Sequence, residues 1–445
     1  MGTGYGTEAA ILVLACLLTA AGRTSAITDV NAAGPQRGIA CSQAETIDYR
    51  RPGKPFVKAR FGPPATVVVA PNAVGSGTGW GEYQFPTIER WDDGALHVTF
   101  SVSADSIKSY GNAPGSMVSR DNGATWPPPT GKHGISGLLL PNGDRVVITT
   151  PKAIPIADLN LPKSLGTVGD TYNKNGPIVY RLTELPAELQ TVRLNRMPKG
   201  SSEWMPEQAK LIDPQALRYS LDGLFPILFW GDVRVAADGS LIAGIYPGYR
   251  VLDDGTVDPM DNTFFYRSTD NGHTWLIQGR ILYHADIKAD PKGDKRMGFT
   301  EPAFEILADG SLLCVMRTSD GLGVGPMYAS RSNDLGKTWS EPAAMTPNGV
   351  LPRLMLLDNG VLVLSSGRPG VQVRFATDGK GKSWTDPFEM VPMTTGGGAD
   401  SCGYTSLLAT GPDSFIIAYS HFKHKTKDGP RKAILIREVT VQRAK

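Results

Sequence analysis

One eight-residue phrase occurs four times along this chain and constrains the fold more than any other feature. The copies read SRDNGATW at 119–126, STDNGHTW at 268–275, SNDLGKTW at 332–339 and, one residue longer, ATDGKGKSW at 376–384. In each octet the Asp side chain can accept hydrogen bonds from backbone N–H groups, the Gly can adopt a positive φ, and the Trp is a large apolar anchor. The octets therefore predict the same tight turn in four repeated units.

A second repeat accompanies the octets. It consists of an apolar run, a turn of the Asp-Gly or Asn-Gly type, and another apolar run. The six copies are FPTIERWDDGALHVTF, GISGLLLPNGDRVVIT, GDVRVAADGSLIAGIY, EPAFEILADGSLLCVM, LPRLMLLDNGVLVLSS and GYTSLLATGPDSFIIAY. Such turns between β-rich runs are the strongest short-range signal for a hairpin. Six hairpins, mostly roughly 50 to 70 residues apart, predict a propeller or array of repeats.

We therefore predict an all-β protein whose residues 61–445 form a single six-bladed β-propeller with these octets in its hairpins. The 51 Gly and 34 Pro residues agree with many short strands and turns. Residues 151–226, rich in Pro and polar side chains, are expected to form a long insertion between blades two and three. Residues 27–60 are expected to be a polar lead-in, and ATVVVA at 65–70 a strand that helps to close the ring.

The beginning of the chain resembles a secretory signal. AAILVLACLLTAAG is a short apolar stretch, and TSA at 24–26 is a small-x-small cleavage pattern, although a positive n-region is missing and Glu8 is present. We predict cleavage near Ala26 and a secreted or periplasmic protein. The remaining cysteines include Cys41 and Cys402, whose pairing the spacing leaves open.

Charge and motifs exclude several classes of function. Lys plus Arg (45) nearly balances Asp plus Glu (43), so no global field favours nucleic acid or an anionic membrane. The sequence contains no CxxC pair, HExxH motif or P-loop. We accordingly predict no metal and no cofactor.

The octets fit the pattern S-x-D-x-G-x-T-W, which resembles the Asp-box (BNR repeat) of the sialidase (neuraminidase) superfamily. The likeness covers most of residues 80–443. It implies a six-bladed propeller and, where the site is complete, hydrolysis of a glycoside of an acidic sugar. Other propellers carry the same box without this chemistry, so function has to be argued from the site.

Alignment of the hairpins on their turns indicates where a site lies. In a propeller, the loop before each innermost strand and the loop after the second strand open on one face. The positions before the innermost strands are Phe85, Gly134, Trp230, Glu301, Leu351 and Tyr404. Arg317 and Arg368 stand just beyond second strands in blades four and five. A Glu, a Tyr and two Arg are thus expected at one mouth.

These residue types suit cleavage of an anionic sugar, which passes through an oxocarbenium-like transition state. A neutral Tyr avoids the repulsion between a carboxylate nucleophile and the sugar's own carboxylate, and a neighbouring Glu can take its proton. By the resemblance, Tyr404 is the nucleophile, Glu301 its base, and Arg317 and Arg368 bind the substrate carboxylate.

Weaker candidates surround this group. Arg353 and Arg374 are alternatives to Arg368. Arg250, after the second strand of blade three, is a further possible ligand of the carboxylate, and Trp230 is a surface on which a sugar can stack.

Two positions depart from the family pattern. The first blade of the family opens with a Tyr-Arg-Ile-Pro-like phrase, whereas this chain has YQFP, with Gln84 at the Arg position. The following loop, SADSIKSYGNAPGS, has Asn112 near the place where related loops carry an Asp. Because Asn cannot act as a general acid, Asp105 is the carboxyl group that we nominate for this role, with Gln84 and Asn112 as substrate contacts.

Three hypotheses therefore remain open. The first is an exo-glycoside hydrolase that removes a terminal acidic sugar, sialic acid first, from a glycan. The second is a lyase or hydrolase for a uronic-acid-containing polysaccharide, suggested by Gln84. The third is a glycan-binding propeller without turnover, suggested by Asn112.

Overall fold

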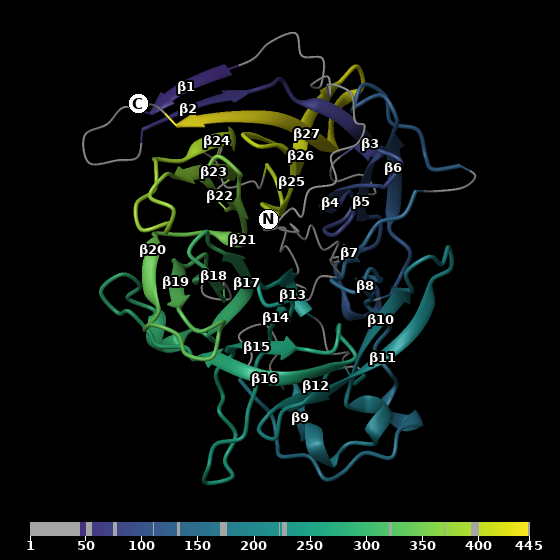
Figure 1. Ribbon diagram of the computed structural model, residues 1–445, viewed down its shortest axis with the longest axis vertical. Helices are drawn as coiled ribbons and strands as arrows, with labels where there is room; N and C mark the ends of the chain where they lie inside the picture. Colours follow the sequence, from purple (N-terminus) through teal and green to yellow (C-terminus); the bar gives the residue numbers. More distant parts are fainter. Residues whose placement is uncertain are drawn as a thin grey trace, which may run out of the picture.

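The computed structural model describes residues 45–49, 56–73, 78–109, 111–130, 134–169, 176–221, 223–224, 229–319, 323–368, 370–392 and 400–443. This part of the protein is all-β. Its helical segments are short 3-10 turns: η1 (Ile107–Ser109), η2 (Ile156–Asp158), η3 (Leu182–Glu184), η4 (Ala187–Leu189) and η5 (Gly293–Lys295). In Figure 1 the sheets surround a common centre, with β13, β17, β21, β25 and β4 on the inner side.

Three antiparallel sheets contain the first, fourth and fifth hairpins. One consists of β4 (Gln84–Arg90), β5 (Leu96–Ser101) and β6 (Gly115–Ser119). The next consists of β17 (Phe299–Ile306), β18 (Leu312–Thr318), β19 (Met327–Ser332) and β20 (Ala343–Thr346). The third consists of β21 (Val350–Leu356), β22 (Leu362–Gly367), β23 (Val371–Ala376) and β24 (Phe388–Val391).

The second and third hairpins belong to an eight-stranded sheet. Its first half is β7 (Leu138–Leu139), β8 (Arg145–Ile148), β10 (Thr191–Met197) and β11 (Met205–Ile212). Its second half is β13 (Phe229–Val235), β14 (Leu241–Ile245), β15 (Thr263–Ser268) and β16 (Thr274–Ile281). Both halves are antiparallel, and the parallel pairing of β11 with β16 joins them.

The insertion expected at about 151–226 is shorter than predicted. β10 pairs with β8 and β11 pairs with β10, so residues 191–197 and 205–212 are strands in the interior of this sheet. Many of their side chains alternate between buried and exposed, and the exposed ones made these segments appear polar in sequence. The remainder holds the small hairpin of β9 (Ile178–Arg181) and β12 (Leu217–Ser220).

The two ends of the described chain meet in the last sheet. β25 (Thr405–Gly411), β26 (Ser414–Thr426) and the long β27 (Gly429–Arg443) are joined by β1 (Glu45–Tyr49), β2 (Val57–Phe61) and β3 (Ala65–Ala73). β3 pairs with β27, in agreement with the strand expected at 65–70. Within the polar lead-in expected at 27–60, β2 also pairs with β27.

The core lies between the faces of neighbouring sheets. Phe265 of β15 packs edge-on against Phe304 of β17, and Phe61 of β2 lies against Phe375 of β23. A strand buried on both faces needs apolar side chains at successive positions rather than alternating ones. This explains the continuous apolar runs of β18 and β22, in which every residue is buried.

The octets form equivalent turns. Ser268 Oγ donates to Asp270 (2.7 Å), Asp270 accepts from the N–H of Thr274 (2.9 Å), and the indole of Trp275 donates to the carbonyl of Gly272 (3.0 Å). The octets at 119–126 and 332–339 repeat these bonds, and the copy at 376–384 keeps those of its Asp and Trp. Hydrogen bonds from Thr125 lower the pKa of Asp121 to about 2. These aspartates are ionised parts of the turns.

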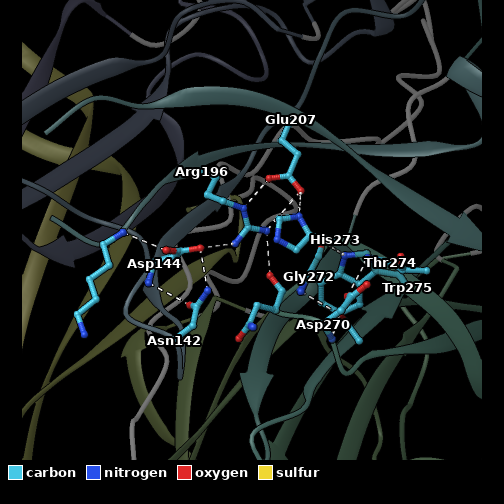
Figure 2. Close-up of polar contacts among 12 residues, drawn as sticks. Asn142, Asp144, Arg196, Glu207, Asp270, Gly272, His273, Thr274 and Trp275 are labelled. Carbon is cyan, nitrogen blue, oxygen red and sulfur yellow. Dashed lines mark hydrogen bonds and ion pairs between the residues drawn. The ribbon is translucent and has the colours of Figure 1, made fainter. Parts of the chain in front are cut away.

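An ionic cluster around the buried Arg196 connects the two halves of the eight-stranded sheet (Figure 2). Arg196 of β10 donates to Glu207 of β11 (2.6 Å) and to Asp144 (3.1 Å), and Glu207 also contacts His273 of the second octet (2.7 Å). Arg196 further donates to the carbonyl of Asn271 (2.9 Å). One guanidinium thus connects both halves beside the parallel β11–β16 pairing.

Replacement of Trp275 by Ala should strongly destabilise the fold. Trp275 is 1 % exposed and fills the core between the halves of the eight-stranded sheet, so truncation leaves a cavity. The expected loss is about 3–5 kcal/mol in the free energy of unfolding, measured by urea denaturation. The neighbouring Leu276→Ala is the control, because Leu276 is 47 % exposed and its loss should change stability by at most about 0.5 kcal/mol. Equal effects of the two substitutions would contradict this account.

Candidate active site

The innermost strands β4, β17 and β21 share a backbone irregularity near their first residues. Phe85, Glu301 and Leu351 adopt left-handed conformations, with φ of 58°, 49° and 38°. The strand register shifts beside each of them. Bulges of this kind re-aim side chains, and non-glycine residues with positive φ are uncommon enough to mark functional positions. These three residues are among the six positions that became equivalent when the hairpins were aligned on their turns.

Glu301 and Tyr404 meet, although 103 positions separate them in the chain. The hydroxyl of Tyr404, just before β25, donates to Oε1 of Glu301. Oε2 of Glu301 accepts from the N–H of Leu351 (2.8 Å). Burial, followed by the charge of Glu301, raises the pKa of Tyr404 well above its usual value. The tyrosine is therefore neutral at rest, with a proton acceptor in contact.

Arg317 of β18 completes this pair. Its Nη1 donates to Glu301 Oε1 (2.6 Å) and to the hydroxyl of Tyr404 (3.2 Å), and its side chain is 3 % exposed. Burial opposes the charge of the guanidinium, but Glu301 and Tyr404 outweigh burial and raise the pKa of Arg317. A permanent positive charge here also favours any negative charge that develops on the Tyr404 oxygen.

Arg368 also lies beside Tyr404. It follows β22 in a left-handed conformation (φ 45°), and its Nε donates to the carbonyl of Cys402 (3.2 Å). Its guanidinium carbon lies 5.9 Å from the centre of the Tyr404 ring. Contact between two glycines explains this position, since a Cβ on Gly367 would lie 2.1 Å from the Cα of Gly403. Only glycines allow the two segments to approach so closely.

Asp105, in the loop after β5, is a carboxyl group that interacts with this assembly. Burial raises its pKa to about 6, opposed by a hydrogen bond from Trp80 and by the charge of Arg368. Glu301 adds to the rise and Arg317 opposes it. Asp105 thus interacts electrostatically with Arg368, Glu301 and Arg317, and it titrates in a range suited to general acid catalysis.

A cavity of about 280 Å³ adjoins Asp105 and Phe85. Its wall combines apolar side chains, such as Phe85, Phe100 and Val102, with hydroxyl and amide groups from the loop after β5 and from the end of β8. The polar lining residues besides Asp105 are Thr99, Ser101, Ser103, Ser106, Ser109, Asn112, Thr149 and Thr150. The space is thus suited to a neutral, hydroxyl-rich group.

Of the other residues nominated from sequence, Gln84 and Arg250 are engaged in contacts with the protein, and Asn112 lines the cavity. Gln84 was expected to contact substrate, but its side chain is fully buried, and its amide oxygen accepts from Lys432 Nζ (2.8 Å) and the N–H of Gly81 (3.2 Å). Arg250 was expected at the mouth, but it forms a salt bridge with Asp258 (3.0 Å). Asn112 lies exposed at the cavity, donating to Ser103 (3.4 Å).

Three further nominees have limited or different roles. The side chain of Trp230, in β13, lies outside the described residues, as do Cys41 and the expected signal peptide. Arg353 donates to the carbonyl of Thr405 (3.4 Å). Arg374 lines a separate groove beside the octet at 376–384.

Sequence analysis missed Tyr246. This residue directly follows β14 and stands at the same distance after the turn glycine (Gly239) as Arg317 after Gly310, so alignment of the turns could have found it. Tyr246 is buried in one apolar cluster with Tyr404, Phe85 and Leu351. Burial and then Glu301 raise its pKa well above the usual value.

Two negative findings apply to the described residues. No group of three or more His, Cys, Asp or Glu side chains is arranged to hold a metal ion. Within the same part of the chain, no helix has the length and hydropathy needed to span a membrane.

No protein-family model and no curated protein matches this chain. Among solved structures, it is similar to a Dyadobacter fermentans protein of unknown function, with a TM-score of 0.56, 16% identity, and coverage of 86% of this chain and 99% of that chain. That similarity concerns the fold alone.

Two sialidases are more distant. The NanB sialidase of Streptococcus pneumoniae gives a TM-score of 0.47 at 12% identity, covering 85% of this chain and 70% of that chain. The Trypanosoma rangeli sialidase in complex with the inhibitor DANA gives 0.40 at 14% identity, covering 88% of this chain and 59% of that chain. This chain thus matches less than two thirds of the trypanosomal protein.

Proposed function

We propose that this protein is an exo-acting glycoside hydrolase that removes a terminal acidic sugar, with sialic acid as the first choice, from a glycan. The observation that carries the proposal is the buried contact of Tyr404, just before β25, with Glu301 and Arg317 of the β17–β18 hairpin. Burying a carboxylate and a guanidinium costs free energy unless the two groups are paired. A neutral hydroxyl in direct contact with such a buried pair is an arrangement typical of active sites.

In the proposed mechanism, Glu301 takes the proton of Tyr404 as the phenol oxygen forms a bond to the anomeric carbon. The bond from that carbon to the leaving oxygen breaks, and Asp105 gives its proton to the departing oxygen. Water, which gives a proton to the ionised Asp105, then attacks the anomeric carbon; the bond from that carbon to the Tyr404 oxygen breaks, and the proton returns from Glu301 to Tyr404. The hydroxyl group of Tyr404 reaches the sugar without the repulsion that an anionic nucleophile would meet.

Arg368 is proposed as the main contact for the sugar carboxylate. Its guanidinium lies beside the Tyr404 ring and Asp105, whereas Arg317 is already bonded to the Tyr404–Glu301 pair. The cavity next to Asp105 is proposed to receive the leaving group, because an acid must contact the oxygen that departs.

The finer features of the fold belong to the same proposal. The sheets around the centre are interpreted as six blades, with each half of the eight-stranded sheet as one blade and the octets as Asp-boxes. A signal peptide over residues 1–26 would bring the enzyme to the periplasm or the exterior, where such glycans occur.

The decisive experiment incubates the full protein with a panel of sialylated and uronic-acid-containing oligosaccharides. Release of a free acidic sugar supports the proposal, provided that the ultraviolet absorbance of an unsaturated uronate does not appear. An unsaturated product would indicate the lyase instead. Binding without release by any member of the panel would indicate a glycan-binding propeller.

Recognition of the carboxylate can be tested separately. A sialic acid analogue should bind the protein more tightly than its neutral methyl ester, by about 10- to 100-fold, because a charge-assisted hydrogen bond contributes about 1.5–3 kcal/mol. Arg368→Gln should abolish most of that difference in calorimetric titrations. Arg90→Gln, at the far turn of the first hairpin, should preserve it. Equal binding of acid and ester by the unmodified protein would refute the acidic-sugar assignment.

A further inference from the structure

A tight turn before β4 lies directly against the loop that carries Asp105. Gly81 in this turn has a φ of 100°, and a Cβ at this position would lie 2.1 Å from the backbone nitrogen of Asp105. The same nitrogen donates to the carbonyl of Trp80 (3.1 Å). The turn and the loop are therefore in backbone contact, at a separation that only glycine permits.

Lys432 of β27 forms hydrogen bonds with the backbone of this turn. Its Nζ donates to the carbonyls of Gly79 (2.5 Å) and Glu82 (3.3 Å), and it lies 4.7 Å from the centre of the Phe422 ring. Lys432 is 4 % exposed, so its charge requires these acceptors and the amide oxygen of Gln84. The buried lysine and glutamine thus fix the position of the turn.

The turn presents the Trp80 side chain between two groups of the site. Its indole Nε1 donates to Oδ2 of Asp105 (3.0 Å), and the guanidinium carbon of Arg368 lies 5.4 Å from its ring centre. Phe85 and Phe422 contact the indole edge-on, at interplanar angles of 77° and 88°. One rigid side chain therefore touches the acid and the cation of the site.

We propose that Trp80 is the positioning residue of the acid: its N–H holds Oδ2 of Asp105, leaves Oδ1 to carry the proton toward the leaving group, and keeps Arg368 beside the same carboxyl. The inference rests on the proposed function for its catalytic consequence. Its physical basis is that an indole N–H donates and never accepts, so it selects one carboxyl oxygen and favours the ionised form.

Four other influences act on the same carboxyl group. Burial and the charge of Glu301 raise the pKa of Asp105, while Arg368 and Arg317 lower it. The hydrogen bond from Trp80 also lowers the pKa of Asp105, as the two arginines do. Loss of the indole N–H should therefore raise the pKa further, whereas loss of aromatic packing alone should not.

Trp80→Phe tests this directly, because it keeps a ring against Arg368 and removes the N–H. The titration of Asp105 is followed by NMR in protein labelled at aspartate carboxyl carbons, with Asp105→Asn identifying the signal. We expect an upward shift of about one pH unit in Trp80→Phe. Trp126→Phe removes an indole N–H from the first octet, where it donates to the carbonyl of Gly123, and should leave Asp105 unchanged.

Gly81→Ala is the second variant, since its methyl group wedges the turn away from Asp105 while the indole remains. It should shift the titration in the same direction. An unchanged Asp105 titration in a folded Trp80→Phe protein, or an equal shift in Trp126→Phe, would overturn the proposal.

Kinetics separate this inference from the proposed function. For a substrate with a sugar leaving group, the alkaline limb of the kcat/KM profile in Trp80→Phe should move to higher pH, by the same amount as the pKa of Asp105 measured by NMR. At pH values below that limb, kcat/KM should fall about tenfold. For an aryl glycoside, whose leaving group needs little protonation, kcat/KM should fall far less. Absence of turnover in the unmodified protein would refute the proposed function, and the NMR measurement would still decide the role of Trp80.

Discussion

Tyr404→Phe should lower kcat by about four orders of magnitude while substrate still binds, because the substitution deletes the nucleophilic oxygen and nothing else. Turnover is measured with a sialoside at saturation, and binding with a sialic acid analogue. Tyr419→Phe is a matched control, since it removes a hydroxyl from another buried tyrosine, in a separate apolar cluster. Near-normal turnover by Tyr404→Phe would rule out this nucleophile.

Glu301→Gln should cause a comparable loss, and the double variant should be no worse than either single one. The two residues share one proton and act as a unit, so their effects do not add. Glu301 also accepts from the N–H of Leu351, so stability should be measured in parallel. Additive losses in kcat would show that the two residues do not act together.

Asp105→Asn should lower kcat/KM by about three orders of magnitude for a substrate whose leaving group is a sugar, and by much less for an aryl glycoside. In the unmodified protein, the acid must be protonated to act. Its pKa is raised to about 6, so activity is present below that value and is lost as the pH rises through it. The variant should lack this alkaline limb.

Asp93→Asn is the matched control for the acid. Asp93 lies in the turn at the opposite end of the same hairpin, paired with Arg120, and its loss should change neither the rate nor the pH profile. If Asp105→Asn retained the alkaline limb, another group would be the acid.

Much of this architecture could be predicted because it is encoded locally. An octet contains its own hydrogen-bonding groups, and a DG turn between apolar runs specifies a hairpin from a few adjacent residues. All six predicted hairpins are antiparallel pairs in the structure. Since strands and turns fix register, alignment on the turns also predicted that Glu301, Tyr404 and Arg317 lie near one another.

Features that depend on distant contacts could not be predicted in this way. The strands β10 and β11 have polar, alternating sequences that resemble loop, and only their pairing with β8 and β16 makes them strands. Arg250 was expected at the mouth because it follows the second strand of its hairpin, but Asp258 lies close enough to pair with it. Such choices depend on which side chain arrives from another part of the chain.

The sequence by itself thus determined the repeated turns, the hairpins and the set of chemical groups at one mouth, because each follows from nearby residues and a two-residue strand period. Only the tertiary structure decided that Gln84 serves Lys432 rather than a substrate, and that Trp80 lies between Asp105 and Arg368. The physical reason is that these contacts join segments up to 353 positions apart, through bulges and left-handed residues that aim side chains in directions no local pattern specifies.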